Sequence, residues 1–260
     1  MSNLREPRGL LPLDDDRWSA LTHAYGPASD VPDTLRAIEA NVSPTYSPSL
    51  AEMRRNPTPW ERIYPLVHQR TVYSAAYAAV PHLVRIGGAL PELREQVFTV
   101  LGDCFAPDTG VPCPADLQVG WEWAREEARR WLPPSGLTGY PMSFALRGFL
   151  ALRHATGVVY RIDQIGSGEV EGLCPHCGEY ALFELEAVAC PPVCYGTPPL
   201  DWPIEETTTV ARDIAAWAGD TYLTECIAAL SAPRACAACG QSFTPEEAAE
   251  AEARTRAPLP

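Results

Sequence analysis

The chain has 260 residues, of which 46% are hydrophobic and 9% aromatic, enough apolar side chains to bury a substantial core. All 20 basic residues are arginine, which excludes a Schiff-base lysine, a P-loop lysine and a lysine general base. The net charge of −13 disfavours nucleic acids and anionic membrane surfaces as partners and favours a basic protein.

The first 160 residues have helical periodicity almost throughout. Segments 14–26 and 31–42 are predicted to form an antiparallel helix pair. Further helices, with apolar residues at i, i+3, i+4 and i+7, are expected over 60–67, 73–88, 93–104, 117–131 and 143–160. Helices of this length, joined by proline and glycine turns, favour a mainly α fold, an α-solenoid of HEAT-like helical hairpins. A compact orthogonal bundle fits the same pattern almost as well.

The character of the sequence changes at Gly166. Alternation of apolar and polar residues near Tyr180 predicts short strands on either side of a cysteine turn. Helical spacing returns over about 210–230. A last helix is predicted to begin after Thr244 as N-cap, with Glu247 completing a capping box.

These patterns divide the chain into three regions. Residues 1–165 are expected to form the HEAT-like helical repeat region. Residues 166–243 are expected to form a zinc-ribbon-like β insert with C-terminal helices, and residues 244–260 a C-terminal helix and tail.

Two Cys-x-x-Cys-Gly motifs indicate a metal site. Cys174 and Cys177 form the first pair, and Cys236 and Cys239 form the second. Two thiolates can bind one ion only if the backbone turns tightly, and glycine after the second cysteine permits positive φ. We therefore predict a structural Zn²⁺ bound by all four, although 58 residues separate the pairs, against about 15–20 in an ordinary zinc ribbon. Two unrelated thiol pairs are the alternative.

Cys190 and Cys194 lie between the two motifs in a proline-rich loop. They do not supply an evident four-ligand set, so their role is left open. Because no apolar run approaches 18 residues and the first residues lack a signal-peptide pattern, we expect a cytoplasmic protein. In that reducing compartment, cysteines favour metal sites or free thiols over disulfides.

A group of histidines and tyrosines in the first half provides further candidate site residues. These are His23, Tyr25, His68, Tyr73, Tyr77 and His82. The simplest interpretation is that Tyr73 and Tyr77 face the core and the histidines form hydrogen bonds with turn carbonyls. Alternatively, the six residues line a binding ridge. In a third interpretation His68, Tyr73 and His82 form a catalytic pocket.

Several stretches resemble a group of uncharacterised, mostly actinobacterial, HEAT-like repeat proteins. The stretches are "RWSALTHAYGPASDVPDTLRAIEA", "WERIYPLVHQRTVYSAAYAAVPHLVRI", the first cysteine motif and "CAACGQSF", and they span roughly residues 14–243. In such proteins a His-Gln-Gly run usually stands where this chain has His68-Gln69-Arg70. The resemblance implies a helical repeat with a zinc clasp and suggests protein binding, since some relatives look like immunity proteins of polymorphic-toxin systems.

We therefore expect a non-enzymatic protein–protein interaction protein, in its sharpest form an immunity-type inhibitor that binds a basic toxin. The alternative is an enzyme, of the kind found in biosynthetic clusters, whose pocket lies around His68, Tyr73 and His82, with zinc only structural. Nucleic acid and membrane are not expected as partners. The sequence leaves open a small-molecule ligand, the identity of the partner and the oligomeric state.

Overall fold

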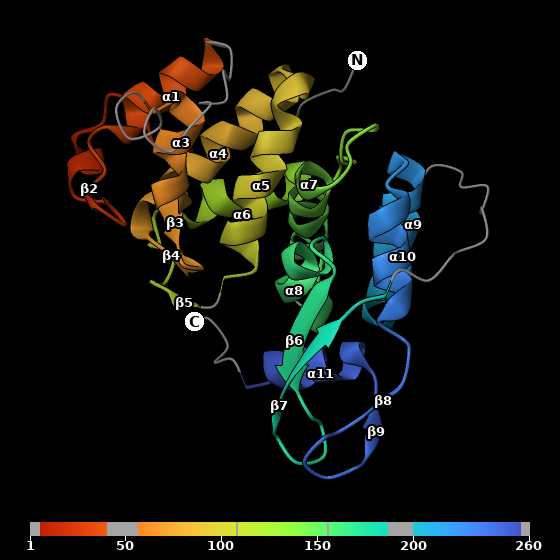
Figure 1. Ribbon diagram of the computed structural model, residues 1–260. Helices are drawn as coiled ribbons and strands as arrows, with labels where there is room; N and C mark the ends of the chain where they lie inside the picture. Colours follow the sequence, from red (N-terminus) through yellow and green to blue (C-terminus); the bar gives the residue numbers. More distant parts are fainter. Residues whose placement is uncertain (1–5, 41–56, 108, 155, 187–199, 256–260) are drawn as a thin grey trace. The chain divides into compact units, whose positions relative to one another are not determined.

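The computed structural model describes residues 6–40, 57–107, 109–154, 156–186 and 200–255 (Figure 1). These residues are mainly helical, with ten α-helices and four small sheets, so the predicted mainly α class is confirmed. They form two compact units. Unit 1 contains the described residues up to Arg130, and unit 2 begins at Trp131. The change of sequence character at Gly166 therefore falls inside unit 2.

Unit 1 is built around one long helix. Its α-helices are α1 (Val31–Glu39), α3 (Pro59–Ile63), α4 (Ser74–Ala89), α5 (Arg94–Phe105) and α6 (Gln118–Ala128). α4 contacts α1, α5 and α6. Its alanines Ala75, Ala76 and Ala79 are fully buried, and these small side chains let the neighbouring helices approach closely. The helices expected over 73–88, 93–104 and 117–131 are confirmed, with a 3-10 helix, η3 (Pro91–Leu93), leading into α5.

The prediction of a helix over 14–26 is wrong. This segment forms a single 3-10 helix, η1 (Asp16–Ser19), and an antiparallel hairpin of β1 (Thr22–His23) and β2 (Gly26–Pro27). Trp18 reaches the core from η1, and its Nε1 donates to the carbonyl oxygen of Pro12 at 2.9 Å. Its burial therefore needs only one helical turn.

The helix expected over 60–67 is shorter than predicted. α3 ends at Ile63 and continues as a 3-10 helix, η2 (Tyr64–Leu66), in which Pro65 lacks the N–H that an α-helix would use. The chain then enters a small sheet of three strands, β3 (Val67–His68), β4 (Thr71–Val72) and β5 (Thr109–Gly110). β4 pairs antiparallel with β3 and parallel with β5.

Unit 2 contains two pairs of consecutive helices and a final helix. They are α7 (Tyr140–Ala151), α8 (Gly157–Ile165), α9 (Thr207–Ala218), α10 (Thr221–Ala229) and α11 (Pro245–Ala253), with a 3-10 helix, η4 (Ile204–Glu206), before α9. The single helix expected over 143–160 is wrong, because Thr156 caps a new helix by accepting from the N–H of Val159. α7 contacts α8, and α9 contacts α10.

Two hairpins complete unit 2. β6 (Glu169–Leu173) pairs with β7 (Tyr180–Glu184), and β8 (Arg234–Ala235) pairs with β9 (Ser242–Phe243), both antiparallel. The predicted strand alternation is confirmed in β7, whose side chains are alternately exposed and covered.

α11 follows directly after β9, and its predicted capping box is confirmed. Thr244 Oγ1 accepts from the N–H of Glu247 at 3.1 Å, and the Glu247 carboxylate accepts from the N–H of Thr244 at 2.7 Å. The helix packs on α8 and β6 at two glycines, Gly157 and Gly172. A Cβ atom at either glycine would lie 2.3–2.4 Å from the α11 backbone, so only glycine permits this approach.

None of the described helices combines the length and the apolar character that a membrane crossing requires.

The β3–β4 turn holds two side chains in a strained backbone conformation. Gln69 and Arg70 have φ of 49° and 59°, and they are the only non-glycine residues with positive φ in the described parts of the chain. A two-residue hairpin turn needs positive φ at both central positions, which glycine adopts most easily. The His-Gln-Gly run expected from the resemblance would place glycine at the position of Arg70.

Replacing Arg70 by glycine is expected to raise the free energy of unfolding by about 1 kcal/mol, because glycine adopts positive φ without a clash of its Cβ. Urea denaturation of the full chain measures the change. Arg70→Ala is the matched control, since it removes the arginine contacts but keeps the Cβ atom. An equal gain in the alanine variant would show that relief of the backbone is not the cause.

Candidate metal centre

The first cysteine motif forms the turn of the β6–β7 hairpin. Six residues lie between Leu173 and Tyr180, which face each other in the ladder. Within this turn the N–H of Cys174 donates to the carbonyl oxygen of Glu179 at 2.8 Å, and the N–H of Gly178 donates to that of Cys174 at 2.9 Å. Gly178 has a φ of 76°, so the glycine is required for the tight turn.

The second motif repeats this geometry in the β8–β9 hairpin. Six residues again separate the paired strand ends. The N–H of Cys236 donates to the carbonyl oxygen of Gln241 at 2.9 Å, the N–H of Gly240 donates to that of Cys236 at 2.9 Å, and φ of Gly240 is 72°. The two motifs are therefore equivalent knuckles, as their shared Cys-x-x-Cys-Gly pattern predicts.

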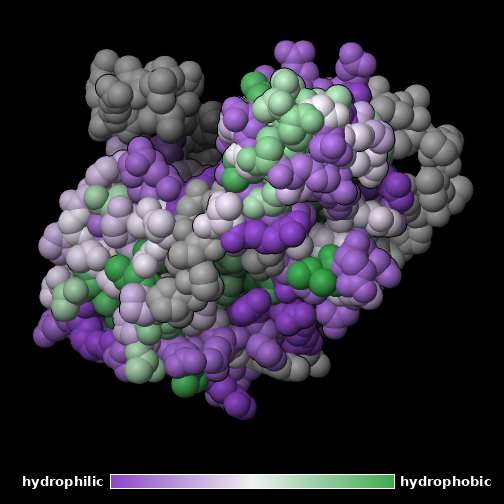
Figure 2. Space-filling view, turned by 90° about the horizontal axis from the view of Figure 1, so that it is seen from below, coloured by the Kyte–Doolittle hydropathy of each residue, from purple (hydrophilic) through white to green (hydrophobic). Residues whose placement is uncertain are grey.

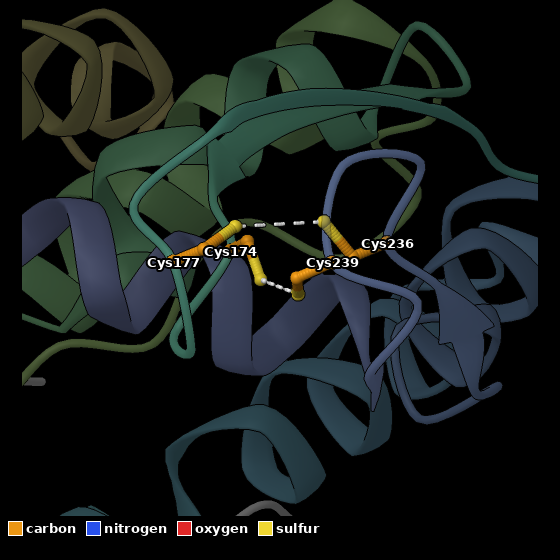
Figure 3. A group of neighbouring side chains, drawn as sticks. All are labelled: Cys174, Cys177, Cys236 and Cys239. Carbon is orange, nitrogen blue, oxygen red and sulfur yellow. Dashed lines mark hydrogen bonds between the residues drawn. The ribbon is translucent and has the colours of Figure 1, made fainter.

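The two knuckles bring all four predicted cysteines together (Figure 3). Their Sγ atoms lie within 4.8 Å of one another. The distance is 3.9 Å between Cys174 and Cys239 and 3.7 Å between Cys177 and Cys236, so each knuckle faces the other through both of its sulfurs. In each knuckle the first cysteine is buried and the second is exposed. The four sulfurs are thus placed to bind one metal ion.

Backbone N–H groups favour a thiolate in this cluster. Hydrogen bonds from the N–H groups of Cys239 and Ala238 lower the pKa of Cys236 to about 6. At Cys177 the N–H of Glu179 acts in the same direction, but desolvation and hydrogen bonds with the other three cysteines raise its pKa to about 12. A full set of four thiolates therefore needs a cation among the sulfurs, which is the electrostatic condition that a bound metal ion meets.

Contacts outside the cluster hold the hairpins against each other. The rings of Phe183 and Phe243 pack edge to face with centroids 5.6 Å apart. His176 Nε2 lies 3.3 Å from the carbonyl oxygen of Ser242, so this histidine bridges the hairpins and does not join the four sulfurs. Cys190 and Cys194, whose role the sequence left open, lie outside the described residues.

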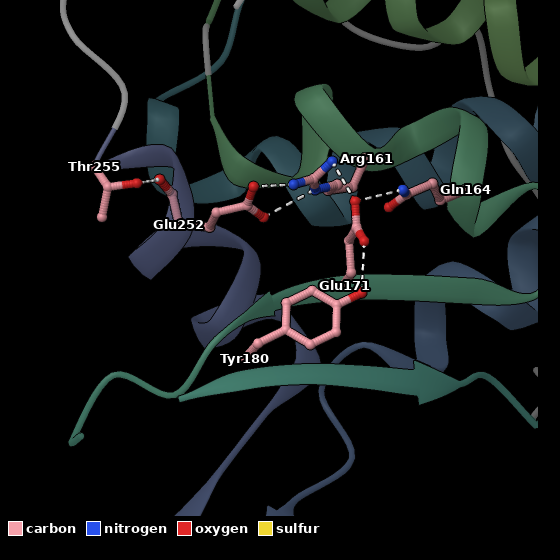
Figure 4. A network of polar contacts seen from close by, with 6 residues as sticks. All are labelled: Arg161, Gln164, Glu171, Tyr180, Glu252 and Thr255. Atoms are coloured by element: carbon pink, nitrogen blue, oxygen red, sulfur yellow. Dashed lines mark hydrogen bonds and ion pairs between the residues drawn. The ribbon is translucent and has the colours of Figure 1, made fainter. Parts of the chain in front are cut away.

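An ion network around the buried Arg161 joins β6 to α8 and α11 (Figure 4). Arg161 of α8 is 6% exposed and pairs with Glu171 of β6 at 3.0 Å and with Glu252 of α11. Glu171 also accepts from Gln164 Nε2 at 2.9 Å and from the hydroxyl of Tyr180 at 2.7 Å. Sequence reasoning missed this network, because its partners are up to 91 residues apart. The one local sign is that Arg161 lies on the apolar face of its helix.

Unit 1 brings three of the predicted binding residues together at its surface. The ring of Tyr25, which is 73% exposed, lies 6.3 Å from the ring of His23 and 5.7 Å from that of His68, measured between centroids. His23 is held on both ring nitrogens: Nδ1 accepts from the N–H of Tyr25 at 3.1 Å, and Nε2 lies 3.2 Å from a carboxylate oxygen of Asp30. The three residues come from the β1–β2 and β3–β4 hairpins.

The other three predicted residues have separate environments. Tyr73 is the half-buried N-cap residue of α4. The hydroxyl of Tyr77 donates to the carbonyl oxygen of Val111 at 2.7 Å, and its ring packs 4.7 Å from Trp121. His82 is 4% exposed, and its Nε2 lies 2.8 Å from the carbonyl oxygen of Leu11.

The structure does not bring the suggested catalytic residues into one site. No hydrogen bond or ring contact joins any two of His68, Tyr73 and His82 within the described ranges. Cavities of about 530 Å³ in unit 1 and about 300 Å³ in unit 2 are lined by other residues, in which glutamates predominate among the charged groups.

In comparisons with known proteins, no family model, no curated protein and no solved structure matched this chain.

Acidification is expected to destabilise unit 1 through His82. Burial lowers the pKa of His82, so the folded state keeps a neutral ring while the unfolded chain takes up a proton below about pH 6.5. The stability that this group contributes is present above that pH and is lost as the pH falls. Urea unfolding between about pH 7.5 and pH 5 should show a loss that His82→Gln reduces. His68→Gln, at an exposed position, is the control, and an unchanged slope in His82→Gln would contradict the assignment.

Proposed function

We propose that this chain is a non-enzymatic protein-binding protein with an acidic surface for a basic partner, and that its four cysteines bind a structural Zn²⁺. Zinc bonds to thiolate sulfur at about 2.3 Å, so a tetrahedral site has sulfur–sulfur edges of about 3.8 Å. The distances of 3.9 Å and 3.7 Å between the knuckles match that edge. Four thiolates fill the tetrahedron and leave no position for water or substrate, which favours a structural role.

Cys174→Ser and Cys239→Ser are each expected to lose the metal and to lower the unfolding temperature of unit 2. Wild-type chain should contain about one zinc per molecule by elemental mass spectrometry, because the four sulfurs make a single site. Cys113→Ser is the matched control, since Cys113 is a half-buried thiol of unit 1 outside the cluster. Zinc retained at full stoichiometry in both knuckle variants would overturn the proposed site.

One observation supports the proposed partner: acidic residues are concentrated in and around the β6–β7 hairpin. From Asp163 to Glu206 the sequence has nine carboxylates and no arginine. Glu169, Glu179 and Glu184 are exposed beside the exposed side chains of Tyr180 and Leu182. Such a surface attracts a cationic partner and repels nucleic acid.

The face drawn in Figure 2 does not suggest a broad apolar interface. Figure 2 shows a face on which hydrophilic residues predominate and hydrophobic residues form only small patches. Recognition through Glu169, Glu179 and Glu184 would depend on charge, with Tyr180 and Leu182 supplying apolar contact area.

Specifically, we propose that the protein is an immunity-type inhibitor whose acidic surface covers the cationic active site of a toxin. The charge and the sequence resemblance support this form. We also propose that the helices are HEAT-like hairpins, which the packing of α7 on α8 and of α9 on α10 supports. We also propose a cytoplasmic location, because a reducing compartment favours cysteine metal sites over disulfides.

The proposed partner can be tested by capture on the immobilised, zinc-loaded chain. A basic protein should be retained from a lysate of the source cells at about 50 mM salt and released at about 500 mM, because salt screens exposed charges. A variant with Glu169→Gln, Glu179→Gln and Glu184→Gln should retain much less of it.

A matched variant removes the same amount of charge from unit 1, with Asp14→Asn, Asp16→Asn and Glu92→Gln at exposed positions. It should retain the partner. Equal loss in both variants would indicate a nonspecific charge effect, and the absence of any basic protein at low salt would refute the proposed function.

A further inference from the structure

We propose that β7 binds an extended basic segment of the partner as an additional antiparallel strand. This inference rests on the proposed function, because it specifies which part of the acidic surface the basic partner occupies and in what conformation. It predicts main-chain hydrogen bonds as well as charge attraction, which is the form of recognition called β-augmentation.

β7 is hydrogen-bonded to β6 along only one of its two edges. At one end of the ladder the N–H of Leu185 donates to the carbonyl oxygen of Gly168 at 2.7 Å, and at the other the N–H of Cys174 donates to that of Glu179 at 2.8 Å. Because hydrogen-bonded pairs alternate in an antiparallel ladder, the odd-numbered residues of β7 bond to β6. The even-numbered residues point their N–H and C=O groups to the opposite edge, which no strand occupies among the described residues.

The even-numbered residues, Tyr180, Leu182 and Glu184, also place their side chains on the exposed face. Tyr180 and Leu182 are each 58% exposed, whereas Phe183 on the opposite face is 8% exposed. The hydroxyl of Tyr180 is fixed by its bond to Glu171 (Figure 4). A side chain already held in place loses little freedom on binding, so this face is pre-organised for a partner.

Charge on the same face selects a basic strand. Glu169 and Glu184 lie directly opposite each other at the end of the ladder, and both are exposed. Like charges in this position are destabilising, and within the described residues neither glutamate has an ion-pair partner. A cation on an added strand would neutralise this repulsion.

The side chains that fit are arginine or lysine at every second position of the added strand. Their charged ends would reach Glu169 and Glu184, while their aliphatic stems cover Leu182 and the ring of Tyr180. A second copy of this chain fits less well, because β7 has no basic side chain that could neutralise Glu169 and Glu184.

The probe is a labelled, end-capped peptide, Arg-Val-Arg-Val-Arg-Val-Arg, titrated against the full zinc-loaded chain by fluorescence anisotropy. In antiparallel pairing with the arginines on the exposed face, the arginine N–H groups point to β7 and the valine N–H groups point away.

Methylation of the arginine amides should weaken binding about tenfold or more, because the edge hydrogen bonds are lost. Methylation of the valine amides should leave affinity nearly unchanged. Equal affinity of the two methylated peptides would overturn the proposal.

Variants of the chain give a second test. Leu182→Pro removes an outward N–H but no hydrogen bond to β6, so it should weaken peptide binding about tenfold while zinc content is retained. Tyr25→Ala, at an exposed tyrosine of unit 1, is the control and should bind normally. Unchanged binding by a folded Leu182→Pro variant would overturn the proposal.

The two proposals fail in distinguishable ways. If the basic protein captured on wild-type chain binds Leu182→Pro with unchanged affinity, the proposed function stands and the β7 site is wrong. If the peptide shows the expected response to methylation but no basic protein is captured, the β7 site is supported and the proposed function fails. A change in molecular mass by light scattering in Leu182→Pro would instead identify a second copy as the occupant and overturn the basic strand.

Discussion

Unit 2 depends on the meeting of two chain reversals that are far apart in the sequence. The knuckle sulfurs lie within 4.8 Å of one another, and Phe183 packs on Phe243 beside them. Since β9 leads directly into α11, the second knuckle also sets where that helix begins. α11 then packs against the glycines of α8 and β6 and supplies Glu252 to the buried Arg161. Separating the knuckles would therefore also disturb the helix packing and the ion network.

The cysteine cluster and the proposed binding strand are adjacent but have different tasks. β7 begins three residues after Cys177, so the first knuckle fixes where the strand starts and how it is directed. The buried Arg161 fixes Glu171, and Glu171 fixes the ring of Tyr180. A metal ion bound by four thiolates has no open coordination position for a substrate. The role of such a site would be to hold the recognition surface in one conformation.

Local patterns in the sequence predicted the local features of the fold. The Thr244–Glu247 capping box, the alternation in β7 and the two cysteine turns each depend on residues within a few positions, and all are found. The predictions were wrong where contacts between residues far apart in the sequence determine the local structure. Trp18 is buried from a single turn because it bonds to Pro12 and packs beside His82, and the carbonyl partner of His82 is 71 residues away. The periodicity of apolar residues in the sequence does not indicate contacts between residues so far apart.

The wide separation of the two knuckles bears on how unit 2 folds. Closing a loop of 58 residues costs only about 1 kcal/mol more than closing an ordinary zinc-ribbon loop, because the entropy of closure grows with the logarithm of length. Equilibrium stability is therefore little affected, but contacts across 59 to 93 residues form late in a search dominated by local structure. Each hairpin can form from local contacts alone. The contact between the two hairpins and the packing of α11 can form only after the intervening helices have folded. The rate-limiting event in folding is thus expected to be the encounter of two preformed turns.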